Sequence, residues 1–391
     1  MLHIIMGSKA QKIAAAAVIT ICLAALSLGA VFARSPKTEE ANPYYTIEYS
    51  LVKVMKVIND SITIDEDAEH AMRGSQSLQV KVLTGSRKGD IQLVMNYLGP
   101  LHEKPAKVGT VLTVTVTSDS REDGYQISVV NYDLTLLIAA MLLIFVAAVI
   151  IVGRKKGVMS LFGLVYSFAA ILLFLIPMWL KGHKAIPLTL ITCAFITVFT
   201  FTLLGGITKK TVSAMLGTLL CTGLACAFAA LCGRIARVSG LTMDEAEWLL
   251  DESQVLPGVT LNVRGLLVSG MIISALGAVM DVAMSIASAV TELNEVDPAL
   301  SRSRLFRSGM NIGRDMIGTM TNTLILAFVG GSLNLMIIMF AAGMQPYQLL
   351  NNDDTIMELI RAIAGSLGLV LAVPLTAFAA SFAIKPQKHG Q

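Results

Sequence analysis

Asp281 lies at the centre of a regular series of small and polar residues inside an otherwise apolar segment. The spacings are four, three, four, four, three and four residues, and the series comprises Gly270, Ser274, Gly277, Asp281, Ser285, Ser288 and Glu292. Residues three and four apart share one face of a helix, so the series predicts a single polar stripe. Asp281 is the only carboxylate well inside any hydrophobic run. Because an ionised carboxylate at the bilayer centre costs roughly 3 kcal/mol or more, it must face protein or water, find partners, or be protonated.

A second polar series follows about 30 residues later, with spacings of four, four and three: Asn311, Asp315, Thr319 and Asn322. Three glycines in the same segment, Gly309, Gly313 and Gly318, allow another helix to approach closely. The connecting loop and the helix start carry four arginines, which can anchor at anionic headgroups and pair with Glu292 or Asp315: Arg302, Arg304, Arg307 and Arg314. We therefore expect the two stripes to face one another.

Together the two stripes could bind and release a proton, or bind a small cation through carboxylate, hydroxyl and amide oxygens. The candidate residues for a substrate or ion path are Asp281, Ser285, Ser288, Asn311, Asp315, Thr319 and Asn322. The alternative interpretation is structural. Small and polar residues also hold membrane helices together, at about 0.6 kcal/mol for each polar contact.

Enzymatic chemistry has little support in the sequence. Phosphate-binding loops, His-Glu-x-x-His and Gly-x-Ser-x-Gly are all missing, and the Ser50/Lys53 pair has no accompanying motif. The five histidines lie outside the apolar runs, and the five cysteines lie inside them without metal-ligand spacing. We therefore predict no catalytic residues, no cofactor and no metal site.

The composition predicts a membrane protein with several spans. Apolar side chains make up 54% of the 391 residues and charged ones 15%, against a typical ~25% charged, and the mean hydropathy is +0.69. A net charge of +3 with 6% aromatics does not suggest nucleic-acid binding. Since a crossing needs about 20 apolar residues, we predict eight helical spans, over residues 13–33, 134–152, 158–180, 185–206, 211–233, 266–290, 316–343 and 362–384.

Lysine and arginine placement predicts the orientation. With the N-terminus inside, thirteen basic residues flank the spans on the cytoplasmic side and six on the other. Both termini are then cytoplasmic if the first run is retained as an anchor, although that run also has features of a cleavable signal peptide. Between the fifth and sixth runs, residues 241–256 predict an amphipathic interfacial helix that begins with a Thr242/Glu245 capping box.

The segment before the second run changes character to alternating strands. Leu78, Val80 and Val82 alternate with polar residues, and residues 90–97 form the return strand of a hairpin. Further strands are expected at 112–117 and 125–130. We predict a small extracytoplasmic β-rich domain of the OB type, which either binds a ligand or protein partner or acts as a folded spacer. The predicted domains are residues 1–33 (anchor or signal), 34–133 (β-rich) and 134–391 (helical bundle).

Several long strings resemble the YibE/F-like family of bacterial multi-pass membrane proteins. They are GAVMDVAMSIASAV, LFRSGMNIGRDMIGTMTNTLILAFVGG and the ending GSLGLVLAVPLTA. The basic turn from Gly153 to Gly157, Pro177 and Lys209-Lys210 also fit the layout of that family, so the resemblance covers roughly residues 75 to 384. It implies a bacterial inner or cell membrane setting and names no substrate.

Two function classes follow. The first is a secondary transporter or permease for an unidentified small solute or ion, with Asp281 as coupling carboxylate. The second is an accessory or regulatory membrane protein, in which the polar stripes serve helix packing and the external domain contacts a protein partner. In either case the bilayer is a partner and nucleic acid is not.

Overall fold

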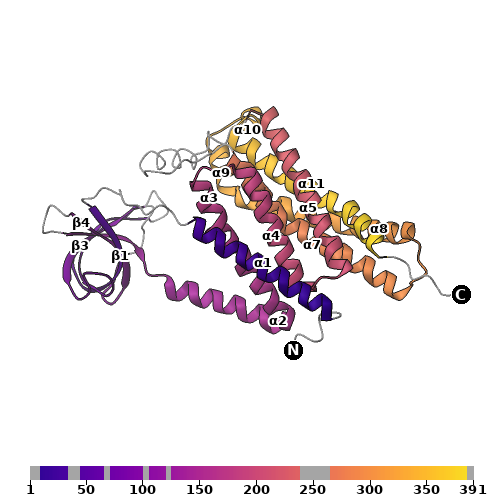
Figure 1. Ribbon diagram of the computed structural model, residues 1–391. Coiled ribbons are helices and arrows are strands. Elements are labelled where there is room, and N and C mark those ends of the chain that lie inside the picture. The colour runs from indigo at the N-terminus through magenta and orange to yellow at the C-terminus, as the bar shows by residue number, and fades with distance from the viewer. Residues whose placement is uncertain are drawn as a thin grey trace. The chain divides into compact units, whose positions relative to one another are not determined.

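A computed structural model of the chain describes residues 9–33, 45–65, 71–99, 105–119, 125–237 and 265–384. The chain divides into two compact units, Thr38–Ala148, called here the β unit, and Met1–Lys37 with Val149–Gln391, called the helical unit (Figure 1). The predicted interfacial helix at 241–256 lies outside the described residues.

The β unit contains one antiparallel sheet of five strands in the order β3-β2-β1-β4-β5. The strands are β1 (Tyr45–Asp65), β2 (Ala71–Val82), β3 (Ile91–Leu98), β4 (Val111–Asp119) and β5 (Tyr125–Tyr132). The predicted hairpin is confirmed, because Lys81 of β2 pairs with Ile91 of β3. Gly85 and Gly89 form its turn with positive φ angles of 85° and 101°, a conformation that glycine adopts without strain.

The long first strand curves the sheet into a half barrel. β1 pairs with β4 along its first half and with β2 along its second half, and register shifts interrupt the second pairing between Val54 and Asn59. Such bulges bend a strand and increase its twist. The alternating apolar residues of four strands then meet inside the sheet, where Val52, Leu78 and Val114 are fully buried.

The β unit also includes the start of the first long helix, α2 (Thr135–Ala169). Asp133 precedes this helix, and its carboxylate accepts a hydrogen bond of 3.0 Å from the Thr135 backbone N–H. Hydrogen bonds from the Thr135 side chain and backbone lower the pKa of Asp133 below its ordinary value, because they stabilise the ionised form. Asp133 therefore caps the helix where the sheet ends.

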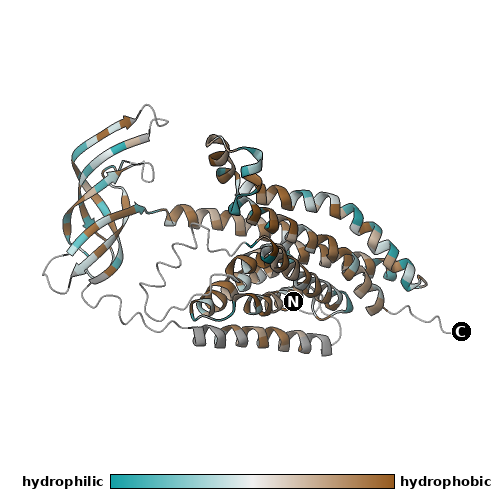
Figure 2. Ribbon diagram, turned by 90° about the horizontal axis from the view of Figure 1, so that it is seen from above, coloured by the Kyte–Doolittle hydropathy of each residue, from teal (hydrophilic) through white to brown (hydrophobic). Residues whose placement is uncertain are grey.

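The helical unit continues α2 and adds ten further elements. They are α1 (Lys9–Ala33), the π-helix η2 (Ala170–Leu175), α3 (Ile176–Leu180), α4 (Ala185–Gly205), α5 (Lys209–Ile235), α7 (Leu266–Val296), α8 (Arg302–Gly331), α9 (Leu333–Ala341), α10 (Pro346–Leu350) and α11 (Asp353–Ala383). Figure 2 shows the helices as mainly hydrophobic along their length, whereas the strands alternate between hydrophobic and hydrophilic residues. The fold is therefore mostly helical and membrane-like, as predicted.

Among the described residues, five helices are long and apolar enough to cross a membrane, or up to six if α8 and α9, bent by 56°, form one broken span. The predicted total of eight is not reached by this criterion. One reason is that residues Thr135–Leu180 count as a single stretch of 46 residues, although α2 is kinked within the predicted basic turn, where Arg154 has φ 49° and ψ −129°. In α1, side chains are described continuously only over Ala15–Ala24, which is shorter than a full crossing.

The centre of the helical unit is formed by α5, α7, α8 and α11, which pack through glycine and alanine. A Cβ atom at Gly368 of α11 would lie 3.2 Å from the Ala225 side chain of α5 and 3.3 Å from that of Val279 of α7. Gly217 of α5 lies directly against Thr376 of α11. Small residues allow such close approach between membrane helices, and these contacts fix which face of each helix turns inward.

Candidate functional site

The polar stripe of α7 lies on the exposed side of the helical unit. The opposite face is fully buried, with Val279, Val282 and Ile286 all at 0% exposure. Asp281 and Ser285 are exposed, and Ser288 is half-buried. Since 3.6 residues make one turn, packing of the apolar face against α5 and α11 directs the polar stripe outward.

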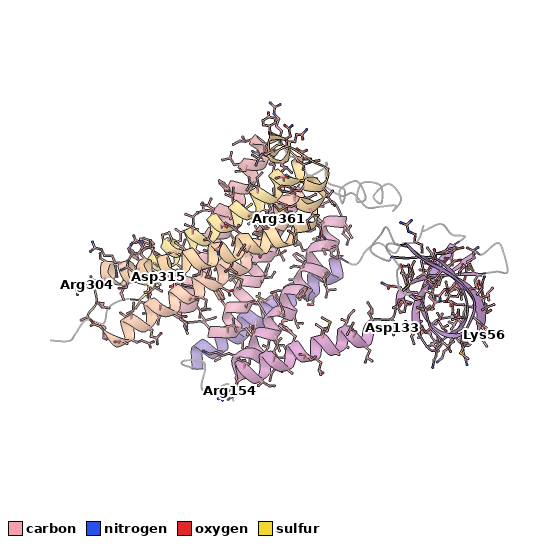
Figure 3. The ribbon with its side chains drawn as sticks, turned by 180° about the vertical axis from the view of Figure 1, so that it is seen from behind. Lys56, Asp133, Arg154, Arg304, Asp315 and Arg361 are labelled. Atoms are coloured by element: carbon pink, nitrogen blue, oxygen red, sulfur yellow. The ribbon has the colours of Figure 1, made fainter. Side chains whose placement is uncertain are left out.

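The polar stripe of α8 is also exposed. This helix turns Leu305, Gly309 and Gly313 inward, and Gly313 lies directly against Val373 of α11. Its four predicted site residues are all exposed: Asn311, Asp315, Thr319 and Asn322. Figure 3 labels Asp315 on this helix, together with Arg304 nearer its N-terminal end.

The two stripes are therefore not packed against each other within one chain. α7 and α8 are neighbours, but they meet through other residues: a Cβ atom at Gly309 would lie 2.9 Å from Val290 Cγ2. The stripe glycines are open by contrast, because a Cβ atom at Gly270, Gly277 or Gly318 would have nothing within 4 Å. The expectation of facing stripes is not met, and of the three α8 glycines only Gly309 and Gly313 serve close packing.

The stripes nevertheless run level with each other. Val290 of α7 meets Gly309 of α8 toward one end, and Gly365 of α11 approaches both Ala275 of α7 and Leu324 of α8 toward the other, at 3.7 and 3.4 Å from its Cβ position. The two helices are thus antiparallel, and the contacts fix which residue of α7 lies level with which residue of α8. Counting residues between these contacts places Asp281 level with Gly318, one residue before Thr319.

Within the described part of the chain, Asp281 makes no hydrogen bond or ion pair. The contacts of the α8 stripe are local: Arg314 Nη1 donates to Asn311 Oδ1 at 3.4 Å, and Thr319 Oγ1 donates to the Met316 carbonyl at 3.1 Å. The expected pairing of loop arginines with Glu292 or Asp315 is not formed among the described residues. The carboxylate of Asp281 is thus exposed on an apolar helix and has no partner among the described residues.

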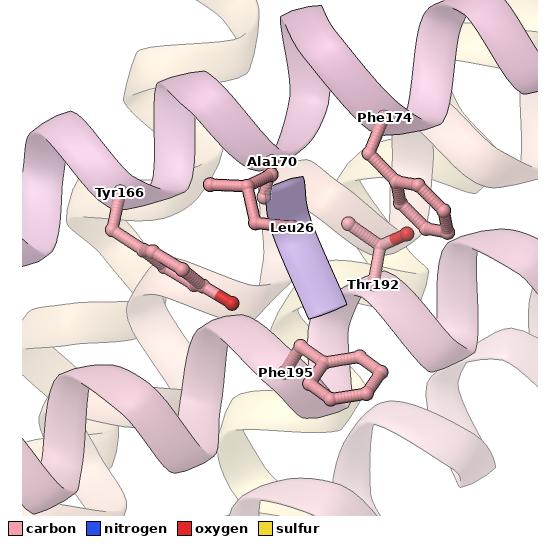
Figure 4. Close-up of a pocket in the computed structure, with 6 residues that line it drawn as sticks. All are labelled: Leu26, Tyr166, Ala170, Phe174, Thr192 and Phe195. Carbon is pink, nitrogen blue, oxygen red and sulfur yellow. The ribbon is translucent and has the colours of Figure 1, made fainter. Parts of the chain in front are cut away.

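A small cavity lies elsewhere in the helical unit, where η2 passes α1 and α4 (Figure 4). Its volume is about 60 Å³, and it is lined by Leu26, Tyr166, Ala170, Phe174, Thr192 and Phe195. The two hydroxyl groups are already engaged, since Tyr166 donates to the Cys22 carbonyl at 3.3 Å and Thr192 to the Leu188 carbonyl at 2.9 Å. π-helical turns often occur at functional sites, yet this cavity is apolar and offers no free polar group.

The sequence interpretation did not identify this cavity. Apolar periodicity shows that a segment is helical, but it does not distinguish a π-helical turn from an α-helical one. Four of the five cysteines are buried among the helices: Cys22, Cys193, Cys221 and Cys226. Within the described residues, His, Cys, Asp and Glu side chains form no group of three or more that could hold a metal ion.

Comparison with known proteins agrees with the resemblance seen in the strings around Asp281 and Asp315. Residues 141–386 match the family described as YibE/F-like protein. This match covers more than half of the chain, and the chain therefore belongs to the YibE/F-like family. The β unit before residue 141 lies outside the match. No curated protein and no solved structure matches the chain.

Proposed function

We propose that this member of the YibE/F-like family is a secondary transporter or permease of the bacterial cell membrane, carrying a small solute or ion along the polar side chains of α7 and α8. The observation that carries the proposal is Asp281. It lies within a 31-residue apolar helix and has no hydrogen-bonding partner among the described residues. Intramembrane carboxylates are costly and commonly mark ion or proton pathways.

The roles of the other residues follow from their chemistry. Asp281 is the coupling carboxylate, which exchanges a proton or binds a cation. Ser285 and Ser288 supply hydroxyl oxygens one and two turns along the same stripe, and Thr319 and Asn322 supply oxygens from α8. Asn311 and Asp315 continue the polar stripe toward the N-terminal end of α8.

The proposal includes the topology predicted from the basic residues. The kink at Arg154 supports two crossings in Thr135–Leu180, because 46 helical residues at ~1.5 Å each would be twice the thickness of the ~30 Å hydrocarbon core. With α1 and the bent pair α8 and α9 each counted as a span, the total is the expected eight. The β unit is then extracytoplasmic, and its strand order and curved core support the OB type.

A second candidate function is favoured by the outward position of the stripes. Open glycines beside exposed polar residues are typical of surfaces where another transmembrane helix packs. In this alternative, the protein is an accessory or regulatory subunit, Asp281 pairs with a partner protein, and no solute is carried.

Flux measurements on the purified protein in liposomes separate the two functions. Internal pH, followed with pyranine under a potassium diffusion potential, reports proton movement, and ²²Na⁺ uptake reports cation movement. We expect flux for the native protein and for the control Glu292→Gln, whose carboxylate lies at the end of the same stripe. Asp281→Asn keeps the shape and hydrogen bonding but cannot titrate, so flux should fall to that of protein-free vesicles. Native flux retained in Asp281→Asn, or no flux in any sample, would favour the accessory role.

A further inference from the structure

The outward polar surface of α7 and α8 differs from a surface built to face lipid. The exposed face of α5 shows what such a surface contains in this protein, since Leu216, Leu220 and Leu224 lie there at 47–55% exposure. On α7 and α8 the corresponding exposed positions hold Asp281, Ser285 and the four polar residues of α8. Hydrocarbon supplies no hydrogen-bonding partner for these groups, so this surface must be covered.

The two stripes complement each other chemically. The α7 stripe offers a carboxylate acceptor, Asp281, flanked by Gly277, which leaves open space for a neighbouring helix. The α8 stripe offers a donor, the side-chain amide of Asn322, whereas the Thr319 hydroxyl already donates to the Met316 carbonyl. A carboxylate that accepts a hydrogen bond from such a donor is stabilised in its ionised form. The Asn322 amide thus suits the Asp281 carboxylate, yet within one chain the two stripes do not meet.

We propose that a second copy of this chain covers the surface, with the α7 stripe of one copy packed against the α8 stripe of the next. The inference rests on the proposed function and adds that the Asp281 site is incomplete in a single chain, because the Asn322 donor comes from the neighbouring copy.

Depth supports a second copy as the occupant. Copies in one membrane with the same orientation are related by rotation about the membrane normal, and such a rotation leaves the depth of every residue unchanged. Counted along the helices from the Val290–Gly309 and Gly365 contacts, Gly277 lies level with Asn322, and Asp281 lies level with Gly318, one residue before Thr319. The stripes of two copies therefore meet in register without any shift along the normal. An unrelated partner would have to match this depth independently.

Cysteine cross-linking between differently tagged copies tests the contact. The five native cysteines are first replaced by alanine, and single cysteines are then introduced so that each copy carries one. Two pairs match in depth, Gly277→Cys with Asn322→Cys and Ser288→Cys with Asn311→Cys. The same four variants in exchanged pairs serve as controls, because residues 311 and 322 are separated by about 16 Å along the helix.

After treatment with an oxidant that enters the bilayer, we expect a dimer carrying both tags for the depth-matched pairs, severalfold above the exchanged pairs. Leu220→Cys, on the lipid-type face of α5, should form no such dimer with Asn322→Cys. Equal yields for all pairs, no dimer, or cross-linking of Gly277→Cys only with itself would overturn the proposed pairing. A further cysteine can be placed within residues 238–264 or 135–148 of the same chain. If Gly277→Cys cross-links to that cysteine within one chain, another part of the same chain covers the stripe, and the proposal is overturned.

The two matched pairs lie at different levels along the helices and share no variant. If one variant fails to insert, the other pair still tests the contact. Insertion is checked by membrane fractionation of each tagged copy. Because cross-linking measures proximity and liposome flux measures transport, the assembly and the transport proposal can fail separately. Dimers without flux would leave the second copy as a structural partner only, and flux without dimers would place the path within one chain.

Discussion

Gly313 is the position where the packing of α8 on α11 can be tested most directly. Its backbone lies against Val373, a fully buried residue of α11, so that an added methyl group would overlap the valine side chain. Val373 has little freedom to move away, because valine in a helix strongly prefers one χ1 rotamer. Gly318, on the exposed side of the same helix, has nothing within 4 Å of its Cβ position. The two glycines therefore form a matched pair for substitution.

The expected loss for Gly313→Ala follows from two opposing effects. Overpacking a close contact costs typically about 1–3 kcal/mol, while replacing a mid-helix glycine by alanine returns roughly 0.5–1 kcal/mol. The net destabilisation is then about 1 kcal/mol. At about 2–4 °C for each kcal/mol in a unit of this size, the unfolding midpoint should fall by about 3 °C. Gly318→Ala should leave it unchanged or slightly higher.

Thermal unfolding in detergent measures this with a thiol-reactive dye, since Cys193 and Cys221 are buried in the native protein and become reactive on unfolding. Combining Gly313→Ala with Val373→Ala should recover stability relative to the sum of the single changes, by at least about 0.5 kcal/mol for residues in contact. Equal midpoints for Gly313→Ala and Gly318→Ala, or strict additivity with Val373→Ala, would refute the close packing on which the inward and outward faces of α8 depend.

The remaining predictions concern orientation and pH. A cysteine at Lys88 should react with a membrane-impermeant maleimide in intact cells and one at Ser303 only after permeabilisation; the reverse pattern would invert the topology. The lowered pKa of Asp133 means that its stabilisation of α2 is full above the unfolded value of about 3.9 and is lost as pH falls through the lower folded value. Asp133→Ala should therefore lower the thermal midpoint at pH 6 but much less at pH 2.5, and an equal loss at both would contradict the capping role.

The strands and most of the helices could be predicted because their signals are local. The thickness of the hydrocarbon core sets the length of an apolar run, and the pleat sets the alternation seen at Leu78, Val80 and Val82. The alternation was found in β2 to β5 close to the expected positions, and the apolar runs were found as helices, although α8 and α9 break one run and the count of eight spans is not reached. The double pairing of β1 was not predictable, because a strand's partners are far away in sequence and depend on where the bulges near Val54 and Asn59 bend it.

The candidate site shows the same division. The spacing around Asp281 was enough to place the polar residues on one face of α7, since helical geometry alone decides which side chains share a face. It did not decide where that face points. The direction depends on the close contacts of α11 with α5, α7 and α8, which are made at Gly217, Gly368 and Gly313. These contacts bury the apolar faces of α7 and α8, so that both polar stripes lie on the outside. Periodicity is a property of one helix, whereas inward and outward are defined only by its neighbours.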